Sequence, residues 1–392
     1  MKAYNTLSDF VRSTAEYGAI GRLVAFERRA HGCAPLRCGQ RNVQILKILC
    51  IVLSVALIAA FCGVSHAGTL NVVTTTTDLR AIAQAVGGDH VKATSICEGN
   101  QDPHFIQAKP SYMMVARKAD LWIRIGMELE IGWEGLILDG SRNQKIQPGQ
   151  PGHLDASDGI LRLEVPTGKV TREMGDVHPE GNPHYWLDPF NARIIAGTIA
   201  ARLSQIDPTD AAVFGANLAT FRTALDERMF GPQLVKEVGG DKLWDLETKG
   251  QLSGYLKEKN LAGQLGGWAG AMAPFRGQQI VTFHRSWSYF VNRFGLTVAD
   301  EMEPKPGIPP SPGHALEIIE KVKSQKIRVL LMEPYYNRQA PDLIAGKTGV
   351  RVLVCANSVD GEPAAKDYLS MVDNVVNKVS AAFKSAPGQK EK

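Results

Sequence analysis

The sequence predicts an α/β protein with two parallel-sheet lobes joined by one long rigid helix, and with a metal ion in the cleft between the lobes. Short apolar runs alternate with helical patterns in two separate stretches of the chain, which is typical of parallel sheets covered by helices. An uninterrupted amphipathic pattern of about 20 residues separates the two stretches. Three histidines stand after strand-like runs or in a stiff loop, and open α/β sheets bind ligands beyond the carboxyl ends of their strands.

Residues 1–67 are predicted to be a leader and signal peptide. Residues 48–61 form an apolar run with one serine, preceded by Arg41 and Lys47 and followed by Ser65-His66-Ala67. A basic flank, an apolar core of roughly 7–15 residues and a small-x-small site make a secretory signal, so we expect cleavage after Ala67 and a periplasmic protein. A membrane span needs about 20 apolar residues. An uncleaved membrane anchor is the alternative.

The charge of the exported part argues against a nucleic-acid partner. The chain has 44 Lys and Arg against 40 Asp and Glu, but eight of the basic and three of the acidic residues precede Gly68. The remainder holds 36 basic and 37 acidic residues, so no basic field is left. It keeps two of the six cysteines, Cys97 and Cys355, which form either one disulfide or two buried thiols.

The first lobe is expected over residues 68–208. Strand patterns cover residues 70–75, 91–96 and 120–126, and helical patterns cover residues 78–86 and 110–118, with a further helix starting at Asp188-Pro189. Asp78 is the expected cap of its helix. Residues 139–151 are rich in Gly, Asn, Gln and Pro and predict a surface loop, with a solvated His153 near its end.

The linking helix is expected over residues 209–232 and the second lobe over residues 233–392. No proline interrupts residues 209–230, and a helix of about 20 residues is roughly 30 Å long, enough to join two domains rigidly. Residues 241–274 predict irregular helix and loop. Strand patterns then cover residues 279–283, 296–299, 328–332 and 350–354, and helical patterns cover residues 286–294, 314–324, 340–347 and 368–383.

The candidate metal ligands are His104, His184 and His284. His104 and His284 each follow a strand-like run and precede a helix-like one, and His184 stands in a proline-rich loop that is too broken for a helix. Convergence of three imidazoles favours a transition-metal site over three structural histidines. His178, beside Pro179 in the same loop, is interpreted as loop structure, with contact to the metal as the alternative. His314, which follows Pro-Gly at a helix start, is expected to be exposed.

Glu333 is the fourth candidate ligand. It directly follows the strand pattern of residues 328–332, so it also lies at the carboxyl end of a predicted parallel strand. The competing interpretations are a carboxylate that caps a nearby helix and one that pairs with Arg338.

Several segments, in this order and spacing, resemble the metal-specific solute-binding proteins of ABC uptake transporters, the cluster A-I zinc-uptake type that carries zinc or manganese. They are Gln101-Asp102-Pro103-His104, Lys118-Ala119-Asp120-Leu121-Trp122, Pro183-His184-Tyr185-Trp186-Leu187-Asp188-Pro189, Phe283-His284 and Met332-Glu333-Pro334. The resemblance covers most of residues 68–383. It implies two lobes around a metal, the motif histidines His104, His184 and His284 as ligands, and delivery to an ABC permease in the inner membrane.

The chain departs from that family at the fourth ligand, which is usually a carboxylate in the loop after the last strand of the second lobe. Residues 355–361 lack an Asp where the family has one. Glu333, Asp360 or water remain for the position, and we favour Glu333. The long His-rich loop that many zinc members carry before the second ligand is also absent.

The predicted function is capture of a divalent metal by an exported, non-enzymatic monomer. Three imidazoles and one carboxylate suit Zn²⁺, whereas manganese prefers a larger share of oxygen ligands. Zinc is therefore the expected cargo, with a manganese-binding protein or a metal-dependent adhesin of the same fold as alternatives. A periplasmic zinc hydrolase is the rival from another class, but the sequence has no His-Glu-x-x-His, nucleophile elbow or second carboxylate cluster.

Overall fold

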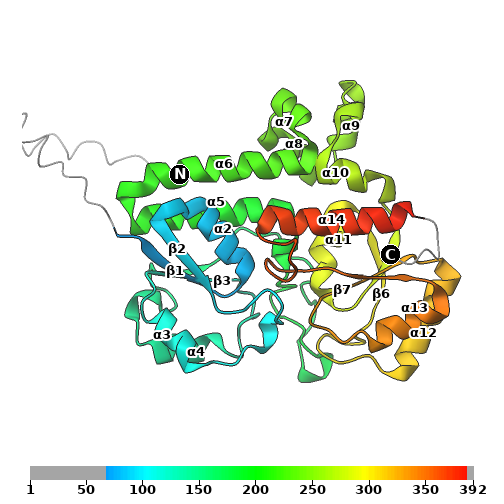
Figure 1. The fold of residues 1–392 in the computed structure, drawn as a ribbon, viewed down its shortest axis with the longest axis horizontal. Helices are drawn as coiled ribbons and strands as arrows, with labels where there is room; N and C mark the ends of the chain where they lie inside the picture. The colour runs from blue at the N-terminus through cyan, green and yellow to red at the C-terminus, as the bar shows by residue number, and fades with distance from the viewer. Residues whose placement is uncertain (1–67, 386–392) are drawn as a thin grey trace, which may run out of the picture. The chain divides into compact units, whose positions relative to one another are not determined.

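Two four-stranded parallel sheets form the centre of the protein (Figure 1). The computed structural model describes residues 68–385, except the side chain of Arg172, so the predicted signal peptide lies outside the described residues. The strands are β1 (Leu70–Thr74), β2 (Val91–Ser95), β3 (Leu121–Arg124), β4 (His153–Asp155), β5 (Gln279–Thr282), β6 (Thr297–Glu301), β7 (Val329–Met332) and β8 (Arg351–Val354). The first sheet has the order β2-β1-β3-β4 and the second the order β6-β5-β7-β8. The predicted fold class, two parallel α/β lobes, is confirmed.

Helices pack on both sheets, and three further helices project from the molecule (Figure 1). The α-helices are α2 (Thr77–Gly87), α3 (Pro110–Ala116), α4 (Glu134–Ser141), α5 (Pro189–Ile206), α6 (Ala211–Phe230), α7 (Pro232–Val238), α8 (Gly240–Thr248), α9 (Leu252–Glu258), α10 (Gly267–Met272), α11 (Ser288–Phe294), α12 (Pro312–Gln325), α13 (Gln339–Thr348) and α14 (Tyr368–Lys384). No helix of residues 68–385 is long and apolar enough to cross a membrane.

The apolar strands of the sequence are buried on both faces, as parallel sheets require. In the first sheet the side chains alternate between two apolar clusters. Val72 and Ile123 join the cluster that contains residues of α2 and α5, and Val73 and Trp122 join the cluster that contains residues of α3 and α4. All four residues of β7 are buried. The continuous apolar runs of the sequence therefore became central strands, with helices on either side.

The long helix α6 has the predicted position and length, with 20 residues after a 3-10 turn at Pro208–Asp210. It packs on α5 and α2 beside the first sheet and on α10, and Figure 1 shows it running alongside α5, with α7, α8 and α9 projecting on its other side. Arg228 of α6 pairs with Asp373 of α14. The helix thus contacts helices beside the first sheet and helices of the C-terminal half of the chain. The lobe boundaries at residues 208 and 232 remain predictions.

Three local predictions for the first lobe were wrong. The cap of α2 is Thr76, whose side chain accepts from the Leu79 amide, whereas Asp78 lies buried inside the helix and accepts from Val359 N. The segment 139–151 is not all loop, because α4 continues to Ser141 and a 3-10 turn follows. His153 begins the short strand β4, and its side chain is only 8% exposed, 3.4 Å from Glu134 Oε1.

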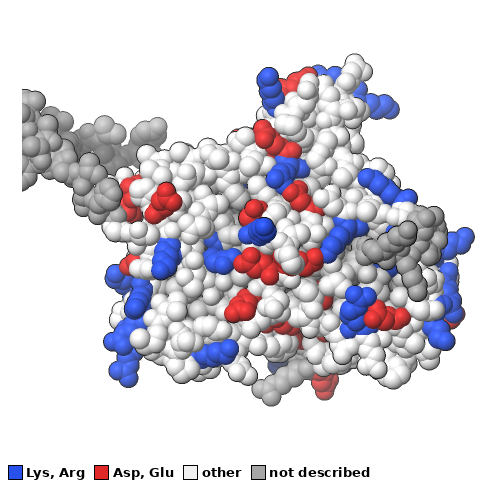
Figure 2. Space-filling view, viewed as in Figure 1, with Lys and Arg blue, Asp and Glu red and all other residues white. Residues whose placement is uncertain are grey.

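Of the two interpretations of the cysteines, the described residues support buried thiols, because Cys97 and Cys355 are both buried and form no disulfide. Charges of both signs are interspersed over the face drawn in Figure 2. That face therefore presents no extended region of a single sign.

Candidate metal site

His104 is held by the turn that follows β2. The short 3-10 helix Pro103–Phe105 is capped by Asp102, which accepts from the backbone N–H of His104 at 3.0 Å. The same carboxylate oxygen lies 2.7 Å from Nδ1 of the His104 ring. Because a carboxylate accepts, Nδ1 carries the proton and the lone pair of the ring stands on Nε2.

His184 is held in the same way by an amide. Asn182 Oδ1 lies 2.9 Å from both the backbone N and the ring Nδ1 of His184. The Asn182 amide nitrogen donates at 2.8 Å to the carbonyl of Arg285, which follows β5 in the second lobe. This second bond fixes which end of the amide is oxygen, so Nδ1 of His184 is the donor and Nε2 again has the free lone pair.

His284 follows β5 and is anchored by a carboxylate of its own lobe. Its Nδ1 lies 2.6 Å from Glu303 Oε2, which also accepts from the backbone N–H of Gly307 at 2.9 Å. Both side chains are buried, with about one twentieth of each exposed. The third imidazole therefore presents Nε2 as well.

The three predicted histidines converge on one point. Each offers a nitrogen atom, and these atoms all lie within 4.8 Å of one another. The ring centroids are 5.1 Å apart for His104 and His184, 5.3 Å for His184 and His284, and 5.5 Å for His104 and His284. A tetrahedral zinc with bonds near 2.0–2.1 Å needs nitrogens about 3.3 Å apart, so a contraction of roughly 1.5 Å or less completes the geometry.

His178, for which the sequence favoured loop structure and left metal contact as the alternative, lies against this cluster. Its ring centroid is 5.4 Å from that of His104. Burial, followed by the nearby His104 and His284, lowers the pKa of His178 to about 3, and burial likewise holds the pKa of His184 well below its ordinary value. Both rings are thus neutral at physiological pH, which is the form that binds metal.

Glu333 and Asp360 are outside the cluster. Glu333 ends β7 and is fully buried, but it is not among the residues whose ligand atoms gather within 4.8 Å. Burial raises the pKa of Glu333 to about 8, and its two buried carboxyl oxygens have no hydrogen-bond partner among the described residues. Asp360 is half exposed and pairs with Arg80 at 2.5 Å.

Two further predictions from the sequence concern Arg338 and His314. Arg338, which was the alternative partner of Glu333, pairs with Asp342 at 3.0 Å. His314, expected to be exposed, has a side chain that is only 15% exposed, and its Nε2 lies 2.7 Å from the Glu301 carbonyl oxygen.

Two cavities adjoin the imidazoles. A cleft of about 910 Å³ is lined by His104 and His284 together with aromatic and aliphatic side chains of both lobes, among them Phe105, Phe283, Tyr336 and Leu343. A much smaller space of about 30 Å³ is lined by His178, His184 and His284. The cleft gives an ion a path to the imidazoles, and the small space is the size of one water molecule or ion.

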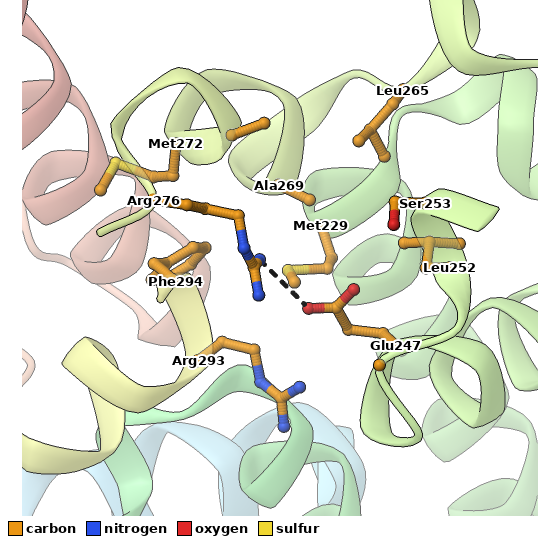
Figure 3. Close-up of a pocket in the computed structure, with 12 residues that line it drawn as sticks. Met229, Glu247, Leu252, Ser253, Leu265, Ala269, Met272, Arg276, Arg293 and Phe294 are labelled. Atoms are coloured by element: carbon orange, nitrogen blue, oxygen red, sulfur yellow. Dashed lines mark ion pairs between the residues drawn. The ribbon is translucent and has the colours of Figure 1, made fainter. Parts of the chain in front are cut away.

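A separate cavity of about 180 Å³ lies where α6 and α8–α10 meet α11 (Figure 3). Arg276 and Glu247 point toward each other across it, 3.8 Å apart, and Arg293 lies at its edge. No histidine or cysteine lines this cavity. Its ion pair joins the projecting helices to the second lobe, and its lining does not suit a transition metal.

Sequence reasoning missed the groups that orient the imidazoles. Asp102 and Asn182 stand two residues before His104 and His184, and a proline lies between in each case. The repeated Asx-Pro-His pattern was a usable signal, because Asp and Asn side chains accept from the backbone N–H two residues on. Glu303 had no such signal, since it lies 19 residues from His284.

Comparisons with known proteins show the family of the chain. The family model of zinc-uptake complex component A, periplasmic (ZnuA), matches residues 72–229 and 264–382, which is more than half of the chain. The chain is 24% identical over 357 residues to the high-affinity zinc uptake system protein ZnuA of Brucella abortus (strain 2308), covering 83% of this chain and 95% of the relative. It is also 24% identical over 320 residues to the manganese ABC transporter substrate-binding lipoprotein PsaA of Streptococcus pneumoniae, covering 81% and 89%.

Solved structures show the same fold. A crystal structure of ZnuA matches with a TM-score of 0.60 and 21% identity, over 80% of this chain and 99% of that one. A Mn-bound periplasmic metal binding protein from Candidatus Liberibacter asiaticus matches with a TM-score of 0.54 and 20% identity, over 80% and 99%. These likenesses extend over both lobes of the chain.

Proposed function

Because the chain belongs to the zinc-uptake complex component A (ZnuA) family, we propose that it is the protein that captures metal for an ABC importer, with Zn²⁺ as its cargo. The observation that carries the proposal is the convergence of His104, His184 and His284 within 4.8 Å. Each ring is anchored through Nδ1. Three preoriented imidazole nitrogens are the ligands of a zinc site.

The two lobes share the ligands. His104 and His184 come from the first lobe and His284 from the second, so a bound ion holds the lobes together. Asp102 and Glu303, hydrogen-bonded to two of the rings, raise the basicity of those ligands and offset part of the charge of the ion. Manganese prefers oxygen donors, and the nitrogen-rich cluster therefore favours zinc over the manganese carried by some relatives.

The proposal includes the route of the protein and its partner. The chain is exported by the predicted signal segment at residues 48–67, works as a monomer in the periplasm, and hands its metal to a permease of the inner membrane. It is a binding protein and not an enzyme. The fourth ligand is open between Glu333, which the sequence favours, and another donor.

The test is metal content and competitive zinc binding of the purified protein, for the wild type and for His184→Ala, Glu333→Gln and His90→Ala. His90 is a matched control, since it is half-exposed on the first lobe and pairs with Asp210. We expect one zinc per chain, lost in His184→Ala and kept in His90→Ala. Absence of tightly bound zinc from the wild type, or wild-type affinity in His184→Ala, would refute the proposal. Weakened binding in Glu333→Gln would make Glu333 the fourth ligand.

A further inference from the structure

The ring of His178 has a buried nitrogen atom, Nε2, without a hydrogen-bond partner. Among the described residues, three histidines have a buried Nε2 atom without a hydrogen-bond partner, namely His104, His178 and His184. The first and last are the candidate ligands of the first lobe. A buried polar atom left unpaired costs about 1–3 kcal/mol, so a folded protein keeps three such atoms together where a ligand satisfies them.

Other histidines of the described chain differ from His178 in this respect. Ring nitrogens of His90, His153 and His314 lie within hydrogen-bond distance of Asp210, Glu134 and the Glu301 carbonyl oxygen, respectively. An ordinary structural histidine in this protein thus finds a protein partner. His178 shares its unpaired Nε2 only with the metal cluster.

His178 also lies against a backbone turn of the first lobe. The backbone of Met127 lies beside its ring. Met127 lies in a turn in which three successive residues, Gly126, Met127 and Glu128, have positive φ angles of 80°, 52° and 64°. Non-glycine residues rarely adopt this conformation, so other groups must hold the turn in place.

Glu130 holds that turn. Its two carboxyl oxygens accept from the backbone N–H groups of Ile125 at 2.7 Å and Gly126 at 3.1 Å. The Tyr185 hydroxyl donates to the Ile125 carbonyl at 2.6 Å. The turn beside His178 is therefore held by the buried side chains of Glu130 and Tyr185, and Tyr185 directly follows His184 in the sequence.

The loop that carries His178 touches both lobes. Asp176 N donates to the Pro306 carbonyl of the second lobe at 2.9 Å, and Asn182 N donates to the Leu163 carbonyl of the first lobe at 2.8 Å. His178, His184 and His284 line one space of about 30 Å³. The loop thus lies where a small movement of the lobes brings its imidazole toward the other three.

We propose that His178 supplies the fourth ligand, so that four imidazoles hold the metal, three from the first lobe and one from the second. The inference rests on the proposed function. Neither Glu333 nor His178 is among the residues whose ligand atoms gather within 4.8 Å, and Asp360 is paired with Arg80. The ring of His178, however, lies 5.4 Å from that of His104 and lines the same small space as His184 and His284, which Glu333 does not. A site of four nitrogens has no anionic oxygen, so it selects Zn²⁺ or Co²⁺ strongly against Mn²⁺.

The direct test uses the wild-type protein, expressed from its full-length sequence and loaded with one equivalent of zinc. X-ray absorption at the zinc edge counts imidazole ligands by their multiple scattering, and we expect four nitrogens and no short oxygen. The Co²⁺-loaded protein is expected to show the intense visible absorption of a tetrahedral ion. Three imidazoles plus one oxygen in the wild type would overturn the inference.

Variants give the second test. We expect His178→Ala and His178→Asn to weaken zinc binding by about 100-fold or more, beyond the 10–100-fold that loss of an orienting group costs, and to lose one imidazole from the absorption spectrum. Glu333→Gln should keep wild-type affinity and ligand count. Thermal unfolding of each metal-free variant shows that it is folded.

The outcomes separate the two proposals. Wild-type protein without tight zinc refutes metal capture itself. Zinc bound by the wild type, with unchanged affinity and unchanged imidazole count in both His178 variants, leaves metal capture standing and refutes the role of His178.

Discussion

A buried ion pair between Asp188 and Arg293 joins the start of α5 to α11. Asp188 caps α5 by accepting from Phe190 N, and Arg293 donates to its two oxygens at 2.7 and 2.8 Å. The side chains are 6% and 10% exposed. Removing one partner leaves a charge in a poorly solvated place, so we expect Arg293→Met to lower the free energy of unfolding by about 3–5 kcal/mol. Urea unfolding followed by circular dichroism measures it.

The pair Arg80 with Asp360 is the control for this prediction. Both side chains are at least 31% exposed, and a pair of that kind contributes about 0–1 kcal/mol. We expect the free energy of unfolding of Arg80→Met to lie within about 1 kcal/mol of the wild-type value. Equal losses in the two variants would show that burial of the Asp188 pair does not decide its contribution.

At the same scale, the identity of the three converging histidines was predictable, but their anchors and His178 were only partly so. The pattern Asx-Pro-His fixes an imidazole locally, through a bond to the residue two positions before it. His284 depends on Glu303 and His178 on the Met127 turn. These partners are brought together by the fold, and spacing along the chain carries no sign of them.

At Gly99, the backbones of two loops from different lobes lie in close contact. A Cβ atom added to Gly99, in the loop after β2, would stand 2.0 Å from the Val359 carbonyl oxygen and 2.5 Å from Gly361 N. Both neighbours are backbone, so neither can rotate away. We expect Gly99→Ala to lower the free energy of unfolding by roughly 1–3 kcal/mol through overpacking, measured as a lower urea midpoint.

The same substitution at Gly215 should have the opposite sign. Gly215 is exposed inside α6, and an added Cβ meets nothing within 4 Å. Alanine is favoured over glycine in a helix interior by about 1 kcal/mol, so Gly215→Ala should raise the urea midpoint. A stable Gly99→Ala would mean that the two loops separate easily.

Long uninterrupted helices and continuous apolar strands were predicted with nearly the right bounds, and short strands with a mixed composition were not. The helix α6 and the apolar strand β7 agree with the sequence to within two residues. The strand β4 has three residues and follows a stretch of Gly, Pro and Gln, so it has no alternation to detect. The sequence predicted Asp78 as the cap because Asp is a preferred N-cap residue, but Thr is preferred as well, and Thr76 two residues earlier accepts the bond.

For the whole molecule, a metal bound to both lobes should act as a clamp. A ligand that binds only the folded state at 100 times its Kd adds about 2.7 kcal/mol to the free energy of unfolding. We therefore expect free zinc at that level to raise the urea midpoint of the wild type and of His90→Ala, and to leave that of His184→Ala unchanged. An equal rise in all three proteins would point to zinc bound elsewhere on the chain.

The contact between the lobes has its own pH dependence, through Asp78. This residue is buried in α2 and accepts from Val359 N at 3.1 Å, beside the bond from Thr77 Oγ1 to the Val359 carbonyl at 2.7 Å. Burial raises the pKa of Asp78 from 3.8 to about 7, with the Val359 bond acting in the opposite direction. Between these values the unfolded chain has lost the proton and the folded protein keeps it, so this group lowers stability as pH rises from about 4 to about 7.

Asparagine can accept the same bond but cannot ionise. The stability of Asp78→Asn relative to the wild type should therefore increase between pH 4 and pH 7, by an amount on the order of 4 kcal/mol at 1.36 kcal/mol per pKa unit, and stay constant above pH 7. Urea unfolding of both metal-free proteins at intervals of pH measures the difference. If the asparagine also loses a favourable contact of Asp78, the stability difference is offset by the same amount at every pH, but it still changes between pH 4 and pH 7. A stability difference that is the same at every pH would show that Asp78 ionises in the folded protein as it does in the unfolded chain, and would contradict the prediction.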